Sequence, residues 1–247
     1  MEPEEYTRMY HLEEGYWWFV GRRLLVRALM KALRLTPPEG SRLLDVGCGT
    51  GAMSRELLPL GQVVSLDFCS EALHMTRTRG LEGLCQGSAE ALPLRDNSFR
   101  AVTALDVVEH LDHDREALAE MFRVTAPGGA AIISVPAFRF LWSEHDVALH
   151  HRRRYTAREL REVVSGAGYR IVKLSYVMSL LFPAVVLVRL LQHLAPRRKE
   201  AKATLPEVGS LGNRLLKAIL SLEAAIVCRV NLPLGVSLIC VAVKDAA

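Results

Sequence analysis

Cysteine is sparse in this sequence and is not arranged in pairs. The five cysteines are scattered, with no CxxC pair and no Cys/His spacing that would suit zinc. An odd, dispersed set of thiols is typical of reduced cytosolic proteins, in which free cysteines are mostly buried as small apolar side chains. The pattern excludes a disulfide scaffold and a zinc finger, and it predicts a cytoplasmic protein.

Long hydrophobic runs are missing as well. No segment has the roughly 20 uncharged apolar residues that span a bilayer. The acidic N-terminus MEPEEYTRMYHLEEG has no apolar run, so we expect no secretory signal. The composition is that of a globular protein with a real core, since 50% of the 247 residues are hydrophobic and 23% are charged.

Charge is unevenly distributed along the chain. Residues 1–150 contain 15 Lys and Arg against 21 Asp and Glu, a net charge of −6, whereas residues 151–247 contain 16 against 6, a net charge of +10. The basic half is either a solvated face or the partner of an anionic substrate or an acidic membrane surface. It has no array of aromatic side chains for stacking on bases, so we expect no nucleic-acid partner.

From residue 42 onward, short apolar runs alternate with amphipathic stretches. The runs predict buried strands, and the stretches predict helices that begin at polar caps and end at Gly or Pro. Ser70 is expected to cap one helix and Thr156 another, where Glu159 completes a capping box. Strands separated by helices form βαβ units, so an α/β fold with a parallel sheet is predicted. The predicted strands are residues 42–47, 62–68, 81–89, 100–108, 130–137, 169–177 and 236–244.

The glycine-rich stretch LLDVGCGTGAMS lies where the first predicted strand meets its helix. Doubly wound sheets bind their ligands at this position. A dinucleotide site would read GxGxxG and place a pyrophosphate on the helix N-terminus. Here Asp45 precedes a GxGxG turn instead, and a carboxylate suits a ligand with positive charge. Asp67 ends the second predicted strand, where an acid can accept hydrogen bonds from both hydroxyls of a ribose.

These residues resemble the class I S-adenosylmethionine-dependent methyltransferases over roughly residues 41–176 and the last strand. In that family the glycine loop holds the methionine end of the cofactor, and the acid after the second strand holds the ribose. GSAEALPL, residues 87–94, resembles the adenine-binding motif, with Ser88 where many relatives have Asp. LDVVEHL, residues 105–111, resembles the motif that faces the sulfonium and the incoming nucleophile. The resemblance implies cofactor contacts from Asp45, Gly47, Cys48, Gly49, Gly51, Asp67, Phe68, Ser88, Ala89 and Asp106.

The resemblance also implies a fold and an activity. The fold is a Rossmann-like, doubly wound, mostly parallel seven-stranded sheet whose last strand is antiparallel. Residues 98–136 are similar to the small-molecule and quinone methyltransferases, so the expected activity is methylation of a small-molecule acceptor on O, N or C, with S-adenosylhomocysteine as product. Two alternatives stay open: a catalytically silent cofactor-binding module and a nicotinamide-dependent oxidoreductase. The missing GxGxxG argues against the oxidoreductase.

Two helical segments lie outside the core of the predicted fold. Residues 1–36 are expected to form an N-terminal helical lid, residues 37–177 with 236–247 the cofactor-binding core, and residues 178–235 a helical insertion before the last strand. The hydrophobic excess lies in the insertion, where Leu215, Ile219, Leu222 and Ile226 share one side of a predicted helix. The insertion could roof a lipidic substrate, form a homodimer or attach to a membrane surface, which would make the protein peripheral to it.

The aromatic stretch YWWF, residues 16–19, is unusual because the chain is only 6% aromatic and has three tryptophans. In relatives with a tryptophan-rich N-terminal segment, that segment packs over the mouth of the cofactor cleft. We therefore expect Tyr16, Trp17 and Trp18 to cover the cleft, with Trp142 on the opposite wall. One tryptophan ring should be buried as an anchor and the other should lie nearer the pocket.

Histidines and arginines supply the remaining candidates on the substrate side. His110 ends the fourth strand and could act as a general base, bind the substrate or shape the pocket; His145 is a second catalytic candidate. The arginines at 152–154 could grip a phosphate or carboxylate, or could form a solvated basic face. His145, Asp146 and His150 match no recognised ligand spacing, so no metal site is predicted. The proposed lid and substrate residues are Tyr16, Trp17, Trp18, Arg22, Trp142, His150, Arg153 and Tyr155.

Overall fold

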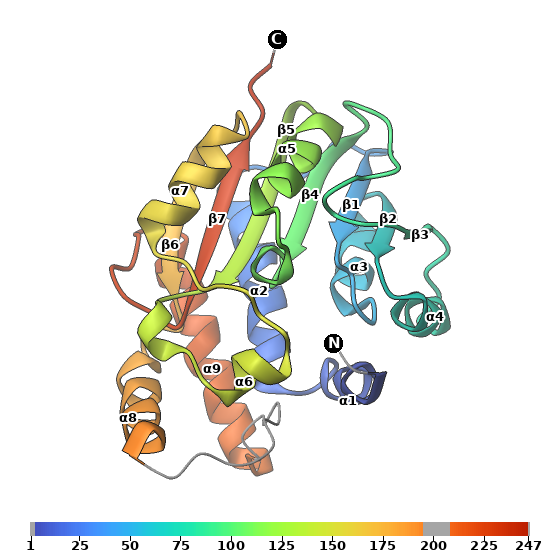
Figure 1. Ribbon diagram of the computed structural model, residues 1–247. Helices are drawn as coiled ribbons and strands as arrows, with labels where there is room; N and C mark the ends of the chain where they lie inside the picture. The colour runs from blue at the N-terminus through green and yellow to red at the C-terminus, as the bar shows by residue number, and fades with distance from the viewer. Residues whose placement is uncertain (1–2, 195–207, 247) are drawn as a thin grey trace.

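A seven-stranded sheet forms the centre of the computed structural model, which describes residues 3–194 and 208–246 (Figure 1). The strand order is β3-β2-β1-β4-β5-β7-β6. All neighbouring strands are parallel except β7, which runs antiparallel to both β5 and β6. This is the predicted Rossmann-like arrangement. The strands are β1 (Arg42–Val46), β2 (Gln62–Asp67), β3 (Leu84–Gln86), β4 (Phe99–Leu105), β5 (Thr125–Pro136), β6 (Arg170–Val177) and β7 (Ser237–Val243).

Helices cover both faces of the sheet because successive strand residues point to opposite faces. Leu44 and Val46 pack into a core with α5 and α7, whereas Leu43 faces a second core formed with α2, α3 and α9. Figure 1 shows α5 and α7 on the near side of the sheet. These helices are α2 (Trp17–Ala32), α3 (Ala52–Leu57), α5 (Asp114–Val124), α7 (Ala157–Gly166) and α9 (Ser210–Val227).

The helix caps agree with the sequence in one case and differ in the other. Thr156 and Glu159 form the predicted capping box at the start of α7. The expected cap at Ser70 is wrong, because α4 (Ser70–Thr78) already includes this residue and Cys69 occupies the cap position. The Ser70 hydroxyl donates to the neighbouring Glu71 carboxylate at 3.0 Å, and the Cys69 side chain makes no capping hydrogen bond.

The N-terminal segment forms two helices that lie over different parts of the molecule. Helix α1 (Pro3–Leu12) lies beside the glycine turn, where Met9 approaches Gly49. Helix α2 packs lengthwise against α9 of the insertion (Figure 1). The contact is close at Gly21, where any Cβ would overlap the Leu220 side chain. In the N-terminal segment, α1 therefore contacts the glycine turn, whereas α2 contacts the insertion.

The insertion contains α8 (Phe182–Leu194) and α9, and the side of α9 with Leu215 and Leu222 is not its buried side. Leu215 and Leu222 are 63% and 59% exposed, whereas Leu220 and Ala224 are buried against α2 and the sheet. Gly21 of α2 has no side chain, so the Leu220 side of α9 can pack closely against α2 at this point. In the part of the chain that is described, no helix is both long and apolar enough to cross a bilayer.

Candidate active site

The loop between β1 and α3 is a glycine turn that other residues could not form. Gly47 and Gly49 both have positive φ, at 63° and 55°, in the region that L side chains rarely adopt. A Cβ at Gly47 would overlap Val107, and one at Gly49 would lie 2.7 Å from the end of Met9. The turn lies at the carboxyl end of β1, the ligand position of such sheets, and α1 covers it at Gly49.

Asp67 ends β2 with its carboxylate directed at this turn. Its Oδ2 accepts a hydrogen bond from the Gly49 amide at 2.9 Å, and its Oδ1 accepts one from the Cys69 amide, also at 2.9 Å. The residue is only 7% exposed, and burial raises the pKa of the carboxyl, while the amide hydrogen bonds oppose the shift. Each oxygen keeps a lone pair, as a pair of ribose hydroxyls would require. These residues fit the nucleoside part of S-adenosylmethionine.

The sequence suggested that Asp45 contacts the ligand, but its carboxylate is bound by side chains of the protein. Its carboxylate accepts hydrogen bonds from the Ser54 hydroxyl at 2.7 Å and the Thr103 hydroxyl at 2.6 Å. It points into the protein, between β4 and α3, and burial raises its pKa. Asp45 thus stabilises the glycine turn from its buried side. It can act on a cationic ligand only through its charge.

The expected adenine residues follow the carboxyl ends of β2 and β3, which are adjacent in the sheet. The Phe68 side chain is 79% exposed, so its ring is available for stacking on a base. The Ser88 hydroxyl accepts a hydrogen bond from the Glu90 amide at 3.1 Å, whereas Ala89 is buried in the core. Cys48 is also buried, and burial with nearby carboxylates raises the pKa of its thiol well above the usual value.

Asp106 connects the strand-four motif to the N-terminal segment. It has a positive φ of 57° directly after β4, and its carboxylate accepts a hydrogen bond from the Ser134 hydroxyl at 2.9 Å. The same carboxylate is ion-paired with Arg22 of α2. The Arg22 guanidinium also lies 5.7 Å from the Phe19 ring centroid. This pair brings a charged group of α2 to the carboxyl edge of the sheet.

A cavity opens beside this ion pair, between α2, α9 and the edge of the sheet. Its own volume is about 50 Å³, and the figure reaches about 500 Å³ only when space open to solvent is counted. Its polar lining comes from Arg22, Asp106, Ser134, Glu223 and Ser237. Its other walls are apolar, formed chiefly by Trp18, Leu25, Val177, Met178, Leu220 and Ile239. The cavity therefore suits a ligand with a polar head and an apolar body.

The two adjacent tryptophans occupy different positions, as expected for an anchor and a pocket residue. Trp17 is buried against Met178 and Leu220, and its backbone amide donates to the Asn213 side chain at 2.8 Å. Trp18 lines the cavity. Tyr16, Trp17 and Trp18 do not cover the glycine turn, because they pack against the insertion. A lid over the turn is provided by α1 instead.

Trp142 does not form the opposite wall of this cavity. It lines a separate surface hollow together with Val147, His150, His151 and Arg152. The short helix α6 (Glu144–Ala148) follows Trp142, and Val147 of this helix lines the same hollow. The expectation that Trp142 and Trp18 face one another is therefore wrong.

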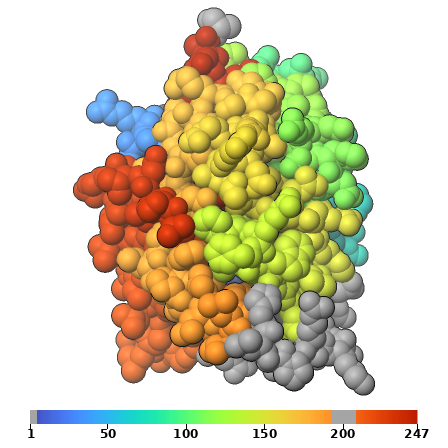
Figure 2. Space-filling view, turned by 60° about the vertical axis from the view of Figure 1, so that its left-hand side comes forward, coloured from blue at the N-terminus to red at the C-terminus, as the bar shows by residue number. Residues whose placement is uncertain are grey.

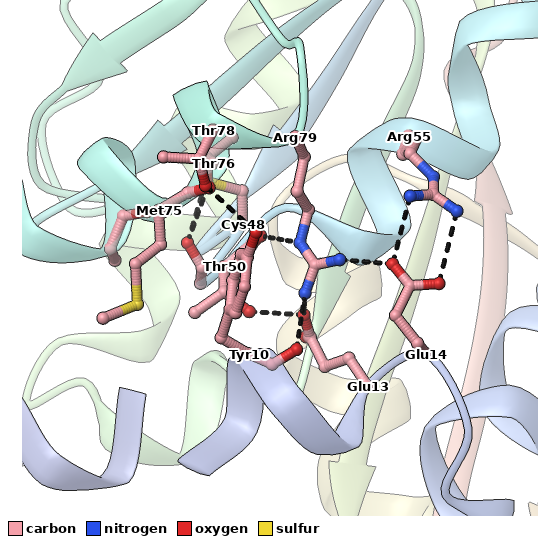
Figure 3. A network of polar contacts seen from close by, with 12 residues as sticks. Tyr10, Glu13, Glu14, Cys48, Thr50, Arg55, Met75, Thr76, Thr78 and Arg79 are labelled. Atoms are coloured by element: carbon pink, nitrogen blue, oxygen red, sulfur yellow. Dashed lines mark hydrogen bonds and ion pairs between the residues drawn. The ribbon is translucent and has the colours of Figure 1, made fainter. Parts of the chain in front are cut away.

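A polar network fastens the end of α1 to the glycine turn (Figure 3). The Thr50 hydroxyl donates to the Glu13 carboxylate, which is buried and has a raised pKa for that reason. The Arg79 guanidinium donates to the Thr50 carbonyl at 2.6 Å and the Tyr10 carbonyl at 2.9 Å. Arg79 also pairs with Glu13 at 3.3 Å and with Glu14. No local sequence pattern predicts this network, because Arg79 lies more than 60 positions after its partners in α1 and the residues that follow it.

Replacing Arg79 by alanine should release α1 from the glycine turn. Removing one partner of a buried ion pair costs about 3–5 kcal/mol. We expect the affinity for S-adenosylhomocysteine to fall on the order of 10-fold, as measured by calorimetry, because the turn loses its cover. Arg77→Ala, on the same helix but exposed, is the matched control. Equal affinities in the two variants would contradict this role.

Of the three arginines at 152–154, expected either to grip an anion or to form a solvated basic face, two are paired within the protein. Arg154 is buried and forms a two-bond pair with Asp146, at 2.7 and 3.0 Å. Arg153 pairs with Asp114 at 3.0 Å, and the Tyr155 hydroxyl donates to the same carboxylate at 2.7 Å. Because carboxylates of this chain already hold these groups, neither Arg153 nor Tyr155 faces the cavity.

Three of the histidines, His110, His145 and His151, lie close together, and none of them lines the cavity. The His110 and His151 rings meet edge to face, with centroids 4.7 Å apart. Burial lowers the pKa of His110 to about 4, and it lowers that of His145 to the same value. His150 lies in the hollow with Trp142. Glu109 is buried beside His110, and sequence reasoning missed it because a carboxylate in a short loop gives no signal of burial.

Comparison with known proteins agrees with this geometry. Residues 44–133 match a family model described as a methyltransferase domain. The chain is 39% identical over 110 residues to the demethylmenaquinone methyltransferase of Renibacterium salmoninarum, which covers 44% of this chain and 46% of the relative. It is 33% identical over 102 residues to a ubiquinone biosynthesis O-methyltransferase of Xanthomonas oryzae, covering 38% and 43%. The chain thus spans less than half the length of these two relatives.

Solved structures show the same fold over nearly the whole chain. A chain of the complex that contains the Haloferax volcanii Trm112 methyltransferase activator superposes with a TM-score of 0.64 at 18% identity. The match covers 99% of this chain and 96% of the other. With the sheet order and the glycine turn followed by Asp67, the match over residues 44–133 shows a methyltransferase domain with the fold of the class I S-adenosylmethionine-dependent methyltransferases.

Proposed function

We propose that this protein transfers a methyl group from S-adenosylmethionine to O, N or C of a small amphipathic acceptor. The observation that carries the proposal is the cavity beside Asp106, whose lining combines a few polar side chains with apolar walls from α2, α9 and the sheet. It opens at the sheet edge that also holds the glycine turn. The names of the two relatives above refer to quinone methylation and biosynthesis, which agrees with an acceptor of this kind.

Several residues would hold the cofactor. Asp67 would accept hydrogen bonds from the ribose hydroxyls, the turn at Gly49 would contact the methionine end, and Phe68 and Ser88 would border the adenine. The bound cofactor supplies a methyl group that is already activated. The protein therefore has to orient the acceptor and exclude water, and orientation can contribute about 7–11 kcal/mol to such a reaction.

Arg22 and Asp106 would orient the acceptor. Their ion pair lines the cavity, where Arg22 can donate hydrogen bonds to an anionic or carbonyl head group. The apolar body would then extend past Trp18 and Leu220 toward the insertion. Trp17 and Asn213 hold α2 against α9 and so maintain the width of the cavity.

Trp18 and Trp142 give a matched test of this arrangement. Trp18→Ala should raise the KM for the acceptor at least about 10-fold, because it removes an aromatic wall, and should leave the affinity for S-adenosylhomocysteine unchanged. Trp142→Ala should change neither quantity, since Trp142 lies in a different hollow. The assay follows transfer of a labelled methyl group to a panel of quinols and phenolic lipids. Indistinguishable KM values for Trp18→Ala and Trp142→Ala would contradict the assignment of the cavity.

Cofactor binding without transfer to any member of this panel would instead favour a catalytically silent module. A nicotinamide cofactor is disfavoured by the turn itself, which has Asp67 and Asp45 close by and therefore repels a pyrophosphate. Titration with both cofactors distinguishes these functions directly.

We further propose that α8 and α9 contact an anionic membrane surface. Figure 2 shows the two helices together at one end of the molecule. Their exposed apolar side chains alternate with Arg189, Arg214 and Lys217, a pattern typical of interfacial helices. The basic residues at 197–202 lie outside the described residues. The exposed apolar residues are Leu187, Val188, Leu190, Leu191, Leu211, Leu215 and Leu222.

Vesicle flotation tests this contact. The protein should float with phosphatidylglycerol vesicles and less with neutral phosphatidylcholine vesicles, and Leu187→Glu with Leu190→Glu should prevent flotation. Leu58→Glu, an exposed leucine outside the insertion, is the control. A homodimer in sedimentation that the double variant dissociates, without flotation of the native chain, would show that the surface is a subunit interface.

A further inference from the structure

Three potential metal ligands converge where the loop after β4 meets the loop after α6. Glu109 and His110 belong to the short helix η2 (Val108–His110), and His151 follows α6. Each residue offers one ligand atom, and these atoms all lie within 4.8 Å of one another. The group differs from His145, Asp146 and His150, the set considered from the sequence.

Glu109 is the most informative member of the group. It is fully buried, and neither carboxylate oxygen has a hydrogen-bond partner among the described residues. Buried carboxylates are normally paired, hydrogen-bonded or bound to a metal, because an isolated one is costly. The two other potential ligands within 4.8 Å are histidines, which agrees with a shared cation.

His151 is already oriented as a metal ligand would be. Its Nδ1 lies 2.9 Å from Oδ1 of Asp146, which fixes the ring and leaves Nε2 available. Asp146 is itself held by the Arg154 guanidinium and by the backbone amide of Ser143, at 2.8 Å. Histidine ligands of metals are commonly hydrogen-bonded to carboxylates in this way.

The two loops are also fixed relative to one another. The Arg152 amide donates to the Glu109 carbonyl at 2.8 Å, so the backbone next to one ligand is bound to the backbone of another. His151 and Arg152 both line the surface hollow that contains Trp142, which gives an ion a route from solvent.

We propose that Glu109, His110 and His151 bind one divalent transition-metal ion. Two imidazoles and one carboxylate suit zinc, cobalt, manganese or iron(II) rather than calcium or magnesium, which prefer oxygen ligands. Three protein ligands leave coordination positions for water or for an oxygen of a small ligand. Glu109 lies three residues after Asp106, which lines the cavity.

Metal titration of the untagged full chain tests the site. Protein stripped with a chelator is titrated with Co²⁺, whose visible absorption reports its ligands, and with Zn²⁺ in a calorimeter. One equivalent should bind, and Glu109→Gln and His151→Ala should each weaken binding at least about 100-fold, because each removes a direct ligand. His113→Ala, an exposed histidine in the following loop, should bind as the native chain does.

A measurement of stability keeps the test decisive if His151→Ala does not fold. Zn²⁺ should raise the Tm of the native chain relative to chelator, since an ion that binds only the folded state stabilises it. The near-isosteric Glu109→Gln should lose this increase. The proposal is overturned if the native chain binds no equivalent of Co²⁺ or Zn²⁺, or if Glu109→Gln binds it as tightly as the native chain.

Discussion

Asp67→Ala should abolish cofactor binding at ordinary protein concentrations. The carboxylate can accept hydrogen bonds from two ribose hydroxyls, and hydrogen bonds to a charged group contribute about 1.5–3 kcal/mol each. Losing both corresponds to at least about 100-fold in affinity. The turn would loosen as well, because the amides of Gly49 and Cys69 lose their acceptor. Calorimetric titration with S-adenosylhomocysteine measures the effect.

Two further variants separate binding from folding in this experiment. Asp67→Asn keeps one acceptor oxygen and should fall between the native chain and Asp67→Ala. Asp96→Ala, an exposed carboxylate before β4 at the opposite edge of the sheet, should bind normally. Unchanged affinity in Asp67→Ala would mean that the nucleoside binds elsewhere.

Arg154→Ala should strongly destabilise the protein. Arg154 is buried and makes two hydrogen bonds to Asp146, which is itself fully buried. Removing one partner leaves an uncompensated buried charge, at a cost of about 3–5 kcal/mol in the free energy of unfolding. Urea denaturation in the presence of a chelator measures this directly.

The neighbouring Arg152 provides the control. Its guanidinium is exposed and pairs with the exposed Asp112 at 3.3 Å, so Arg152→Ala should change the free energy of unfolding by less than about 1 kcal/mol. Equal effects of the two substitutions would mean that the Arg154–Asp146 pair does not stabilise the fold.

The sheet and its helices could be predicted because their signals are local. Apolar runs mark each strand, and Thr156 with Glu159 marks the start of α7 within four residues. The face that α9 buries could not be predicted, since both of its sides carry leucines. The choice depends on Gly21, almost 200 residues earlier, which lets Leu220 approach α2. Periodicity indicates an amphipathic helix but not its neighbour.

The candidate site shows the same limit. Gly47, Gly49 and Asp67 were identified because the glycine turn and the acid at the end of the next strand have a fixed spacing. Asp45 was assigned to the ligand because its burial beneath the turn depends on Thr103, a strand away. Arg79 was missed for a similar reason.

Charged residues near the histidines were misjudged because their partners are distant or buried. Three consecutive arginines read as one basic patch, yet Arg153 and Arg154 pair with different carboxylates. Glu109 reads as a surface carboxylate and is fully enclosed. Only the packing of the loops distinguishes a solvated charge from a buried one.

A crystal structure with S-adenosylhomocysteine bound would test the central claim most directly. The ribose hydroxyls should lie within about 2.5–3.0 Å of the Asp67 carboxylate, in hydrogen-bond range. The sulfur should face the cavity bordered by Asp106 and Trp18. A product bound with its ribose away from Asp67, or with its sulfur directed away from that cavity, would contradict the proposed path of the methyl group.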